Sequence, residues 1–401
     1  MPYYIGDVIK DKNRLVARTP EEFKKTGVDV ILGNGVEAID AEKGQVKLSD
    51  GAILPYDILV MGTGADAILP EMAGQDLPGV YTLRNLTDGL RIKSYLNEKV
   101  IRKAAIVGAG FIAMEMSEAL RNLGIETVVL SRSPLPVARW DAAFSKMIVE
   151  ELHKNQVTFL PGTKPVAIEK GKDFALRMTT NCGEMDADLI LMALGIKRNV
   201  KLAEAIGLKT GESGAIQVNF AQRTSCEEIY AVGDCCEVFN RVSQKWMYLP
   251  LGDIANKQGR IAGQNIGGSP GIFPGVVGAQ SFKVFNLEVA ATGLTEAEAL
   301  KSGFHPVSNI IWGLPIARSM AKDEKLGIKL IADKPSGKLL GAQSISAGEG
   351  AVKRINMLSV ALWAGMDLTD ISYLDLAYSP TFGGAWDPIH IAAQGLMRKM
   401  A

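Results

Sequence analysis

Apolar runs and amphipathic segments alternate along this chain, and the pattern predicts an α/β fold. Short continuous apolar runs at 56–61, 104–107 and 127–130 are typical of strands that are covered on both faces of a parallel sheet. A segment with helical spacing of apolar positions occupies 114–122, and another apolar strand is expected within 186–195. Strands that alternate with helices in this way predict strand–helix–strand units.

The N-terminal segment shows a different pattern. Thr19 begins a capping box with Pro20 at the first helical position, so a short helix is expected there. Alternating residues at 28–31 predict a strand after that helix. Residues 36–48 predict a hairpin or meander, and Ser49-Asp50-Gly51 supplies its turn.

The second half repeats the first pattern and then changes. Residues 213–272 return to strand-then-helix patterning, and from about 275 a mixed sheet-and-helix segment begins. It ends in a terminal helix whose start is predicted at Asp387, the cap, and Pro388, in the first turn.

Composition narrows the classes of protein that fit this pattern. A chain of 401 residues is long enough for two to three domains with buried cores. Lys+Arg and Asp+Glu each number 44, so no general attraction to nucleic acid or to an anionic membrane is expected. No apolar run approaches the ~20 residues that span a bilayer, and the charged N-terminal segment is unlike a signal peptide. We therefore expect a cytoplasmic protein without a nucleic-acid or membrane partner.

The chain has four cysteines, Cys182, Cys226, Cys235 and Cys236, and none forms a C-x-x-C pair. Neighbouring cysteines rarely form an unstrained disulfide because their Cα atoms lie only ~3.8 Å apart. We interpret Cys235 and Cys236 as small buried side chains beside a cofactor loop, with a redox pair as the alternative. The three histidines do not join the cysteines and carboxylates in a cluster, so no metal site is expected.

A glycine-rich fingerprint of the dinucleotide-binding type follows the strand at 104–107. It reads Gly108-x-Gly110-x-x-Ala113 and opens a helix. The first glycine makes the tight turn, the second admits the pyrophosphate, and the small third residue packs the helix on the strand. The helix N-terminus then faces the phosphates. This segment is predicted to bind a nucleotide.

The end of the next strand discriminates between nicotinamide cofactors. An NAD site usually has an acidic residue about 20 residues after the fingerprint, whereas this chain has Leu130-Ser131-Arg132-Ser133. A guanidinium suits a 2′-phosphate, so Arg132 is predicted to bind NADPH, with Arg139 as a second contact. The alternative is an exposed arginine at an NADH or dual-specificity site.

Three features together point to a known superfamily: Gly62-Thr63-Gly64 after a strand, the turn at 108–113, and a strand that ends in Gly233-Asp234. In this order they make the chain resemble the flavin- and nicotinamide-dependent pyridine nucleotide–disulfide oxidoreductases. Other segments are similar to its single-cysteine branch, which contains NADH oxidases, NADH peroxidases, and coenzyme A-disulfide and polysulfide reductases. These segments are 2–5, 249–251, 255–260, 291–295 and 376–378.

The resemblance implies an α/β protein with two Rossmann-like nucleotide-binding domains, the FAD one N-terminally truncated, plus a C-terminal α+β dimerisation domain. The FAD domain would combine 1–86 with 213–272, the NAD(P) domain would span 87–212, and the dimerisation domain of a homodimer would span 273–401.

The resemblance also assigns roles to individual residues. Asp234 would hold the ribityl chain of FAD, and the helix that begins at Leu251 and Gly252 would point its N-terminus at the flavin ring. Glu115 would face the nicotinamide amide and the flavin edge, and Phe111 takes the place of a tyrosine lid over the flavin. The predicted cofactor-binding residues are Gly62, Thr63, Gly64, Gly108, Gly110, Phe111, Ile112, Ala113, Arg132, Arg139, Gly195, Gly233, Asp234, Leu251 and Gly252.

Tyr378 and Glu115 are the predicted catalytic residues. Tyr378 matches the tyrosine of the branch that works across the dimer on the substrate or the oxygen adduct, and the alternative is a buried tyrosine whose hydroxyl is satisfied. His390, after Asp387, is a weaker candidate for a proton donor, whereas His153 and His305 are expected to be surface residues.

Three departures from the branch affect the expected activity. The branch has a redox cysteine just before the segment that matches residues 1–4, preceded by a βαβ unit for FAD, so we expect that this chain is shortened at its N-terminus. Trp386 replaces the lysine of coenzyme A-disulfide reductases, and their extra tyrosine is replaced around Ser319-Met320. Coenzyme A disulfide is therefore not the expected substrate.

The predicted function is an FAD-dependent NAD(P)H oxidoreductase that passes hydride through the flavin to a small-molecule acceptor, which is a disulfide, polysulfide, oxygen or peroxide. The alternative is a catalytically inactive protein that binds NAD(P) and dimerises, or a fragment that starts at an internal methionine of a longer gene.

Overall fold

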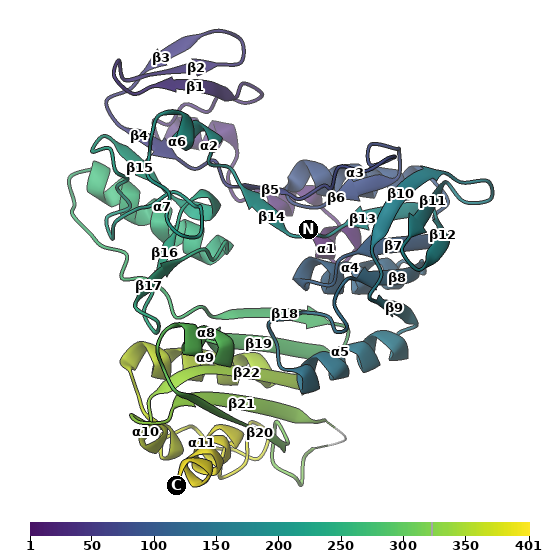
Figure 1. The fold of residues 1–401 in the computed structure, drawn as a ribbon, viewed down its shortest axis with the longest axis vertical. Helices are drawn as coiled ribbons and strands as arrows, with labels where there is room; N and C mark the ends of the chain where they lie inside the picture. Colours follow the sequence, from purple (N-terminus) through teal and green to yellow (C-terminus); the bar gives the residue numbers. More distant parts are fainter. Residues whose placement is uncertain (322–323) are drawn as a thin grey trace. The chain divides into compact units, whose positions relative to one another are not determined.

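The computed structural model describes residues 1–321 and 324–401, which form two compact units (Figure 1). Unit 1 combines Met1–Lys10, Ala67–Gly195 and Val277–Ala401, and unit 2 combines Asp11–Asp66 and Ile196–Val276. Within the described ranges, no helix is both long and apolar enough to cross a membrane.

The centre of the nucleotide-binding part of unit 1 is a parallel five-stranded sheet. Its strand order is β6 (Val80–Thr82), β13 (Leu189–Met192), β7 (Lys103–Val107), β8 (Glu126–Ser131) and β9 (Val157–Pro161). The predicted strands at 104–107 and 127–130 are confirmed as β7 and β8. The strand expected within 186–195 is β13.

Successive side chains of these strands point to opposite faces, and each face has its own cover. Ile106 and Val129 pack with the three helices α3 (Leu86–Glu98), α4 (Phe111–Asn122) and α5 (Ala142–Lys154). Val107 and Leu130 pack instead with an antiparallel sheet, labelled β10 to β12 in Figure 1. That sheet contains β10 (Pro165–Lys170), β11 (Leu176–Thr180) and β12 (Gly183–Ala187). Cover on both faces explains the continuous apolar runs of the parallel strands.

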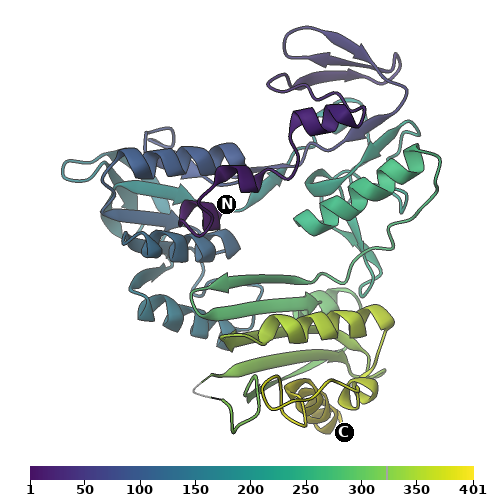
Figure 2. The ribbon, with the colours of Figure 1, turned by 180° about the vertical axis from the view of Figure 1, so that it is seen from behind.

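The C-terminal part of unit 1 is an antiparallel five-stranded sheet with helices. Its strand order is β18 (Gln280–Val284), β19 (Leu287–Gly293), β22 (Leu339–Ala347), β21 (Leu326–Asp333) and β20 (Pro306–Gly313). Helix α9 (Ala351–Ala364) packs on β19 and β22, and α11 (Pro388–Met400) packs on β20 and β21 (Figure 2). The shorter α8 (Glu296–Lys301) follows β19, and α10 (Leu368–Ser372) contacts α11. The predicted start of the terminal helix is confirmed, because Asp387 caps α11.

Unit 2 is built from smaller sheets. The strands β1 (Val36–Asp40), β2 (Gln45–Leu48) and β3 (Ile53–Pro55) form an antiparallel sheet, which confirms the predicted meander. A second sheet pairs β4 (Leu59–Met61) with β15 (Ile229–Ala231) in parallel. Unit 2 also contains α2 (Pro20–Lys25), α6 (Lys201–Ala205), the hairpin of β16 (Val238–Asn240) and β17 (Lys245–Met247), and α7 (Gly252–Ile266). Its strand β14 (Ile196–Arg198) pairs with β5 (Ala65–Ala67), whose last residue is assigned to unit 1.

One predicted element of unit 2 is wrong. Residues 28–31 form no strand, and Val28, Val30 and Ile31 are all exposed. An alternating pattern makes a strand only where a neighbouring strand accepts its hydrogen bonds and a second layer buries its apolar face. The run at 56–61 is also less buried than predicted, since Val60 of β4 is 43% exposed.

The two units divide the chain at other points than the predicted domain boundaries. Residues 67–86 contribute β6 to the parallel sheet, whereas 196–212 belong to unit 2. The short α1 (Pro2–Ile5) packs on α3 and α4, so Met1–Lys10 belongs to unit 1. The assignment of domains to cofactors stays a prediction.

Candidate nucleotide and flavin sites

The glycine turn at 108–113 joins β7 to α4 at the carboxyl edge of the parallel sheet. Gly108 has φ +112°, and a Cβ there would lie 2.2 Å from the carbonyl oxygen of Ala193, so only glycine fits. Gly110 is the N-cap of α4 and offers no side-chain cap to the first N–H groups of the helix. Ala113 is fully buried. The geometry therefore supports the predicted pyrophosphate contact, because uncapped N–H groups at the start of a 12-residue helix favour an anion.

Arg132 lies directly after β8, at the same edge of the sheet. It is exposed, and it makes no hydrogen bond or ion pair with any residue of 1–321 or 324–401. Its guanidinium is therefore free to meet a phosphate. Gly195, which follows β13, has φ +101°, and its carbonyl oxygen accepts a hydrogen bond from Ile68 N at 3.0 Å.

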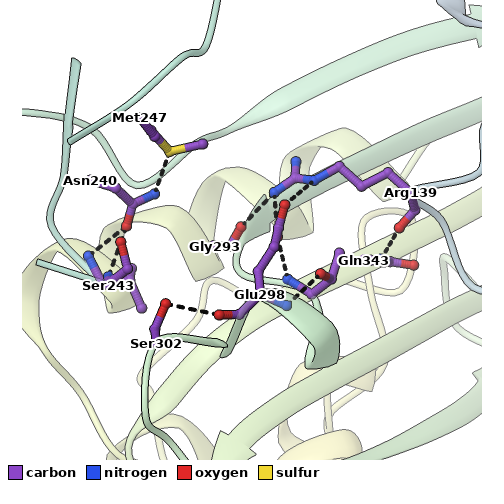
Figure 3. Close-up of polar contacts among 10 residues, drawn as sticks. Arg139, Asn240, Ser243, Met247, Gly293, Glu298, Ser302 and Gln343 are labelled. Carbon is purple, nitrogen blue, oxygen red and sulfur yellow. Dashed lines mark hydrogen bonds and ion pairs between the residues drawn. The ribbon is translucent and has the colours of Figure 1, made fainter. Parts of the chain in front are cut away.

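Arg139 has partners of another kind, as Figure 3 shows. Its guanidinium pairs with the carboxylate of Glu298 at 3.0 Å and donates to the carbonyl oxygen of Gly293 at 3.1 Å. Sequence reasoning missed these contacts, since Glu298 lies in the C-terminal part of unit 1. The predicted contact of Arg139 with NADPH stays untested, but here its guanidinium is occupied.

Glu115 and Phe111 share helix α4. Burial raises the pKa of Glu115. The positive amino group of Met1 opposes this rise, and the nearby carboxylate of Glu118 adds to it. The ring of Phe111 stacks on Phe282 with 4.8 Å between centroids, and it meets Trp140 edge-on at 5.1 Å. Phe111 is thus packed among aromatic side chains of unit 1. The sequence predicted a position over the flavin for Phe111 and did not predict these aromatic contacts.

Two loops of unit 2 meet at one edge because β4 and β15 are parallel neighbours. After β4, Thr63 Oγ1 donates to the carbonyl oxygen of Asn199 at 2.6 Å, and Asn199 Nδ2 donates back to Thr63 O at 3.1 Å. Gly62 precedes this contact, and Gly64 follows it with φ +65°. The loop is thereby held in one shape.

After β15 the chain turns at Gly233, whose φ is +77° and whose N–H donates to Gln258 Oε1 on α7 at 2.8 Å. Asp234 follows and is half-buried. Helix α7 starts at Gly252 after its N-cap Leu251 without a side-chain cap. The sequence indicated Gln258 only as one residue of a segment shared with the family. In the structure Gln258 is buried, and its hydrogen bond with Gly233 holds this loop in place.

Cys235 and Cys236 come next in the chain and are both buried and free, as the simpler interpretation predicted. The Sγ of Cys235 lies 3.4 Å from the carbonyl oxygen of Met61. A hydrogen bond from Cys236 lowers the pKa of Cys235 to about 6. Complete burial nevertheless separates this sulfur from solvent, so the low pKa does not make it a surface nucleophile.

The residues of unit 2 fit one end of FAD. The loop at 62–64, Asp234 and the uncapped start of α7 supply polar groups and free N–H donors of the kind that bind a ribityl chain and a flavin ring. Residues 11–66 and 196–276 contain no second turn like that at 108–113, and we assign no residue here to the ADP end of FAD.

Tyr378 lies in the segment between α10 and α11 and is 58% exposed, so its side chain is not buried within its own subunit. Its predicted catalytic role stays a prediction. The segment is held at several points. Pro380 O accepts a hydrogen bond from Ala317 N at 3.0 Å, and Asp387 forms a bidentate pair with the fully buried Arg354 at 3.0 and 2.8 Å.

His390 uses both ring nitrogens inside this structure. Nδ1 accepts a hydrogen bond from Asp387 N at 3.1 Å, so Nε2 carries the proton and donates to Leu374 O at 2.9 Å. This arrangement supports a structural role for His390, whereas the sequence also allowed a proton donor at this position. His153 and His305 are exposed, as predicted.

The fold and the glycine turn define a class of proteins, the reductases that bind a nicotinamide nucleotide on a parallel sheet and carry a separate antiparallel domain. The family model for pyridine nucleotide-disulphide oxidoreductases matches residues 3–259, and that for the dimerisation domain of the same family matches 279–388. The chain therefore belongs to the pyridine nucleotide-disulphide oxidoreductase family.

The relatives resemble the chain over almost its whole length. The NAD(P)H sulfur oxidoreductase (CoA-dependent) of Pyrococcus furiosus is 34% identical over 98% of this chain and 89% of its own. The NADH oxidase of Methanocaldococcus jannaschii is 30% identical over 100% of this chain and 90% of its own. The solved structure of an NAD-dependent persulfide reductase from A. fulgidus is 36% identical, has a TM-score of 0.94, and is matched over 99% of this chain and 75% of its own.

These findings confirm the predicted superfamily and the predicted fold class. Within the superfamily, the chain is similar to NADH oxidases and to sulfur oxidoreductases. They support a flavoprotein oxidoreductase with FAD and NAD(P)H as cofactors. The matched dimerisation domain supports the predicted homodimer.

Proposed function

We propose that this protein oxidises NAD(P)H and transfers the electrons by way of FAD to a small sulfur or oxygen acceptor. The observation that carries the proposal is the turn at 108–113, where a glycine with positive φ and an uncapped helix start meet at the carboxyl edge of a parallel sheet. The relatives named above act on sulfur compounds or are NADH oxidases, which supports these two classes of acceptor.

The residues of the chain would bind and orient the nucleotide. The N–H groups at the start of α4 would hold the pyrophosphate, and the free guanidinium of Arg132 would pair with the 2′-phosphate of NADPH. Glu115, whose pKa is raised by burial, would hydrogen-bond the nicotinamide amide. The redox chemistry itself, uptake of hydride and delivery of electrons, is what FAD would supply when bound. In unit 2, Thr63 and Asp234 would orient it.

The acceptor we favour is a sulfur species smaller than coenzyme A disulfide, or oxygen. Trp386, which replaces a lysine, is 54% exposed and carries no charge for a coenzyme A phosphate. The exposed Tyr378 in the same segment would contact the acceptor of the partner subunit in a homodimer. We further propose a cytoplasmic location, where a reducing environment keeps the four cysteines free.

The test is an anaerobic and an aerobic assay of NADPH and NADH oxidation by the FAD-supplemented protein with polysulfide, coenzyme A disulfide, peroxide and oxygen. Turnover with polysulfide or oxygen but not with coenzyme A disulfide is expected. Nucleotide binding without turnover of any acceptor would contradict the proposal and support the alternative of a binding protein.

A further inference from the structure

The loop between β8 and α5, residues 132–141, is held in a strained shape. Val137 has φ +45°, a region that β-branched residues rarely occupy, and it is buried. Strain of this kind persists only where the surroundings fix the backbone. One such contact is the Val137 N–H, which donates to Ala109 O at 2.9 Å. The loop is thus tied to the middle of the glycine turn.

The next residues of the loop are tied to the C-terminal domain. Arg139 Nε and Nη2 contact Glu298 Oε1 and Oε2 at 3.3 and 3.0 Å, and Nη2 also donates to Gly293 O (Figure 3). Glu298 is itself fixed, because its carboxylate accepts from Thr295 N at 2.8 Å in the capping box of α8. A two-point pair to a fixed carboxylate specifies both the place and the orientation of Arg139.

A second contact to the C-terminal domain acts on the backbone of the loop. Gln343 of β22 is buried, its Oε1 accepts from Asp141 N at 2.7 Å, and its Nε2 donates to Arg139 O at 3.1 Å. Lys329 of β21 adds an ion pair to the side chain of Asp141 at 2.7 Å. Both ends of the stretch 139–141 are therefore held by side chains of the antiparallel sheet.

The geometry points to Glu298 and Gln343 as positioning residues for nucleotide binding, which hold loop 132–141 in the shape that presents Arg132 to the phosphate of NADPH. Arg139 is then a clamp of this loop and not a second phosphate contact. This inference rests on the proposed function, because it assumes that the nucleotide binds beside Arg132.

The substitution Glu298→Gln tests the inference with little disturbance. Glutamine also serves in a capping box and still accepts from Thr295 N, but it removes the charge that holds Arg139. The matched control is Lys283→Gln, which breaks another ion pair of the same two domains, Lys283 to Glu118 at 2.8 Å, without touching the loop. Dissociation constants for NADPH and NADH are measured on the full chain by titration calorimetry, together with the amide exchange rate of Val137.

We expect Glu298→Gln to weaken NADPH binding about 5- to 10-fold and to speed the exchange of the Val137 amide, with Lys283→Gln within about twofold of the unchanged protein. Equal effects of the two substitutions, or an unchanged Val137 exchange rate, would overturn the inference. Failure of the unchanged protein to bind either nucleotide would refute the proposed function instead, and the exchange rate of Val137 would still decide whether Glu298 holds the loop.

Discussion

At the scale of single residues, the proposed contact between Arg132 and the 2′-phosphate is the one that distinguishes NADPH from NADH most directly. A charge-assisted hydrogen bond contributes about 1.5–3 kcal/mol, so Arg132→Ser is expected to raise the KM for NADPH by roughly 10- to 100-fold. The KM for NADH, which lacks the 2′-phosphate, should change less than about twofold. Steady-state kinetics with both nucleotides measure the ratio.

Lys172→Ser is a suitable control, because this lysine is exposed and lies in the turn between β10 and β11. Equal losses for NADPH and NADH in Arg132→Ser would show that Arg132 does not discriminate between them, and the preference for NADPH would then be wrong.

Residues differ in how far their roles could be predicted from the sequence. Gly108 was predictable because its neighbours in sequence, a strand before it and a helix after it, create the need for a positive φ. The partner of Arg139 was not predictable, since Glu298 is 159 positions away and only the tertiary fold brings it near. The exposure of Tyr378 also depends on tertiary structure, because the aromatic ring alone favours burial.

At the scale of elements, the predictions that held rest on local signals. The capping box at Thr19 and the cap at Asp387 both start helices where expected, because the side chain and the N–H groups that it satisfies lie within three residues of each other. The strand predicted at 28–31 lacked such a local cause. Alternation of apolar and polar residues does not make a strand by itself, because a strand also needs a neighbouring strand, which only the tertiary structure provides.

The junction of α5, α8 and β21 predicts a dependence of stability on acid. Burial would raise the pKa of Asp141 and of Glu296, yet hydrogen bonds from Lys329 hold both below their ordinary values. Carboxyl groups with lowered pKa values stabilise the fold above their unfolded pKa of about 4, and this stability is lost as the pH falls through the lower folded values.

Lys329→Met is expected to lower the free energy of unfolding at pH 7 by about 1–2 kcal/mol, a value reduced for the partial exposure of Glu296. The variant should also lose less stability than the unchanged protein between pH 5 and pH 3, roughly the window in which the carboxyls take up protons. Urea denaturation across this range measures both effects. Parallel pH curves for the two proteins would contradict this account of the junction.

The segment that carries Tyr378 depends on the buried pair of Arg354 and Asp387. Removing one member of a buried ion pair typically costs about 3–5 kcal/mol, because the other charge stays buried without a partner. Arg354→Met is therefore expected to lower the free energy of unfolding by about that amount and to increase the proteolytic sensitivity of residues 373–386. Cleavage unchanged within this segment would show that other contacts hold it.

At the scale of the whole molecule, the order of strands and helices along the sequence predicted the class of fold. It did not predict which segments of the chain combine into each of the two compact units. The five-stranded parallel sheet and the antiparallel C-terminal sheet belong to one compact unit, although a segment of the other unit lies between them in the sequence. Contacts such as those of Lys329 and Gln343 produce this grouping, and side-chain pairs so distant in sequence leave no periodic signal.

The central claim is that this chain binds a flavin that NAD(P)H reduces. The most direct test is the visible absorption spectrum of the purified protein incubated with FAD and freed of unbound flavin, recorded without oxygen before and after NADPH is added. We predict a retained flavin band that bleaches with NADPH. Absence of a retained band, or a band that NADPH leaves unchanged, would contradict the account.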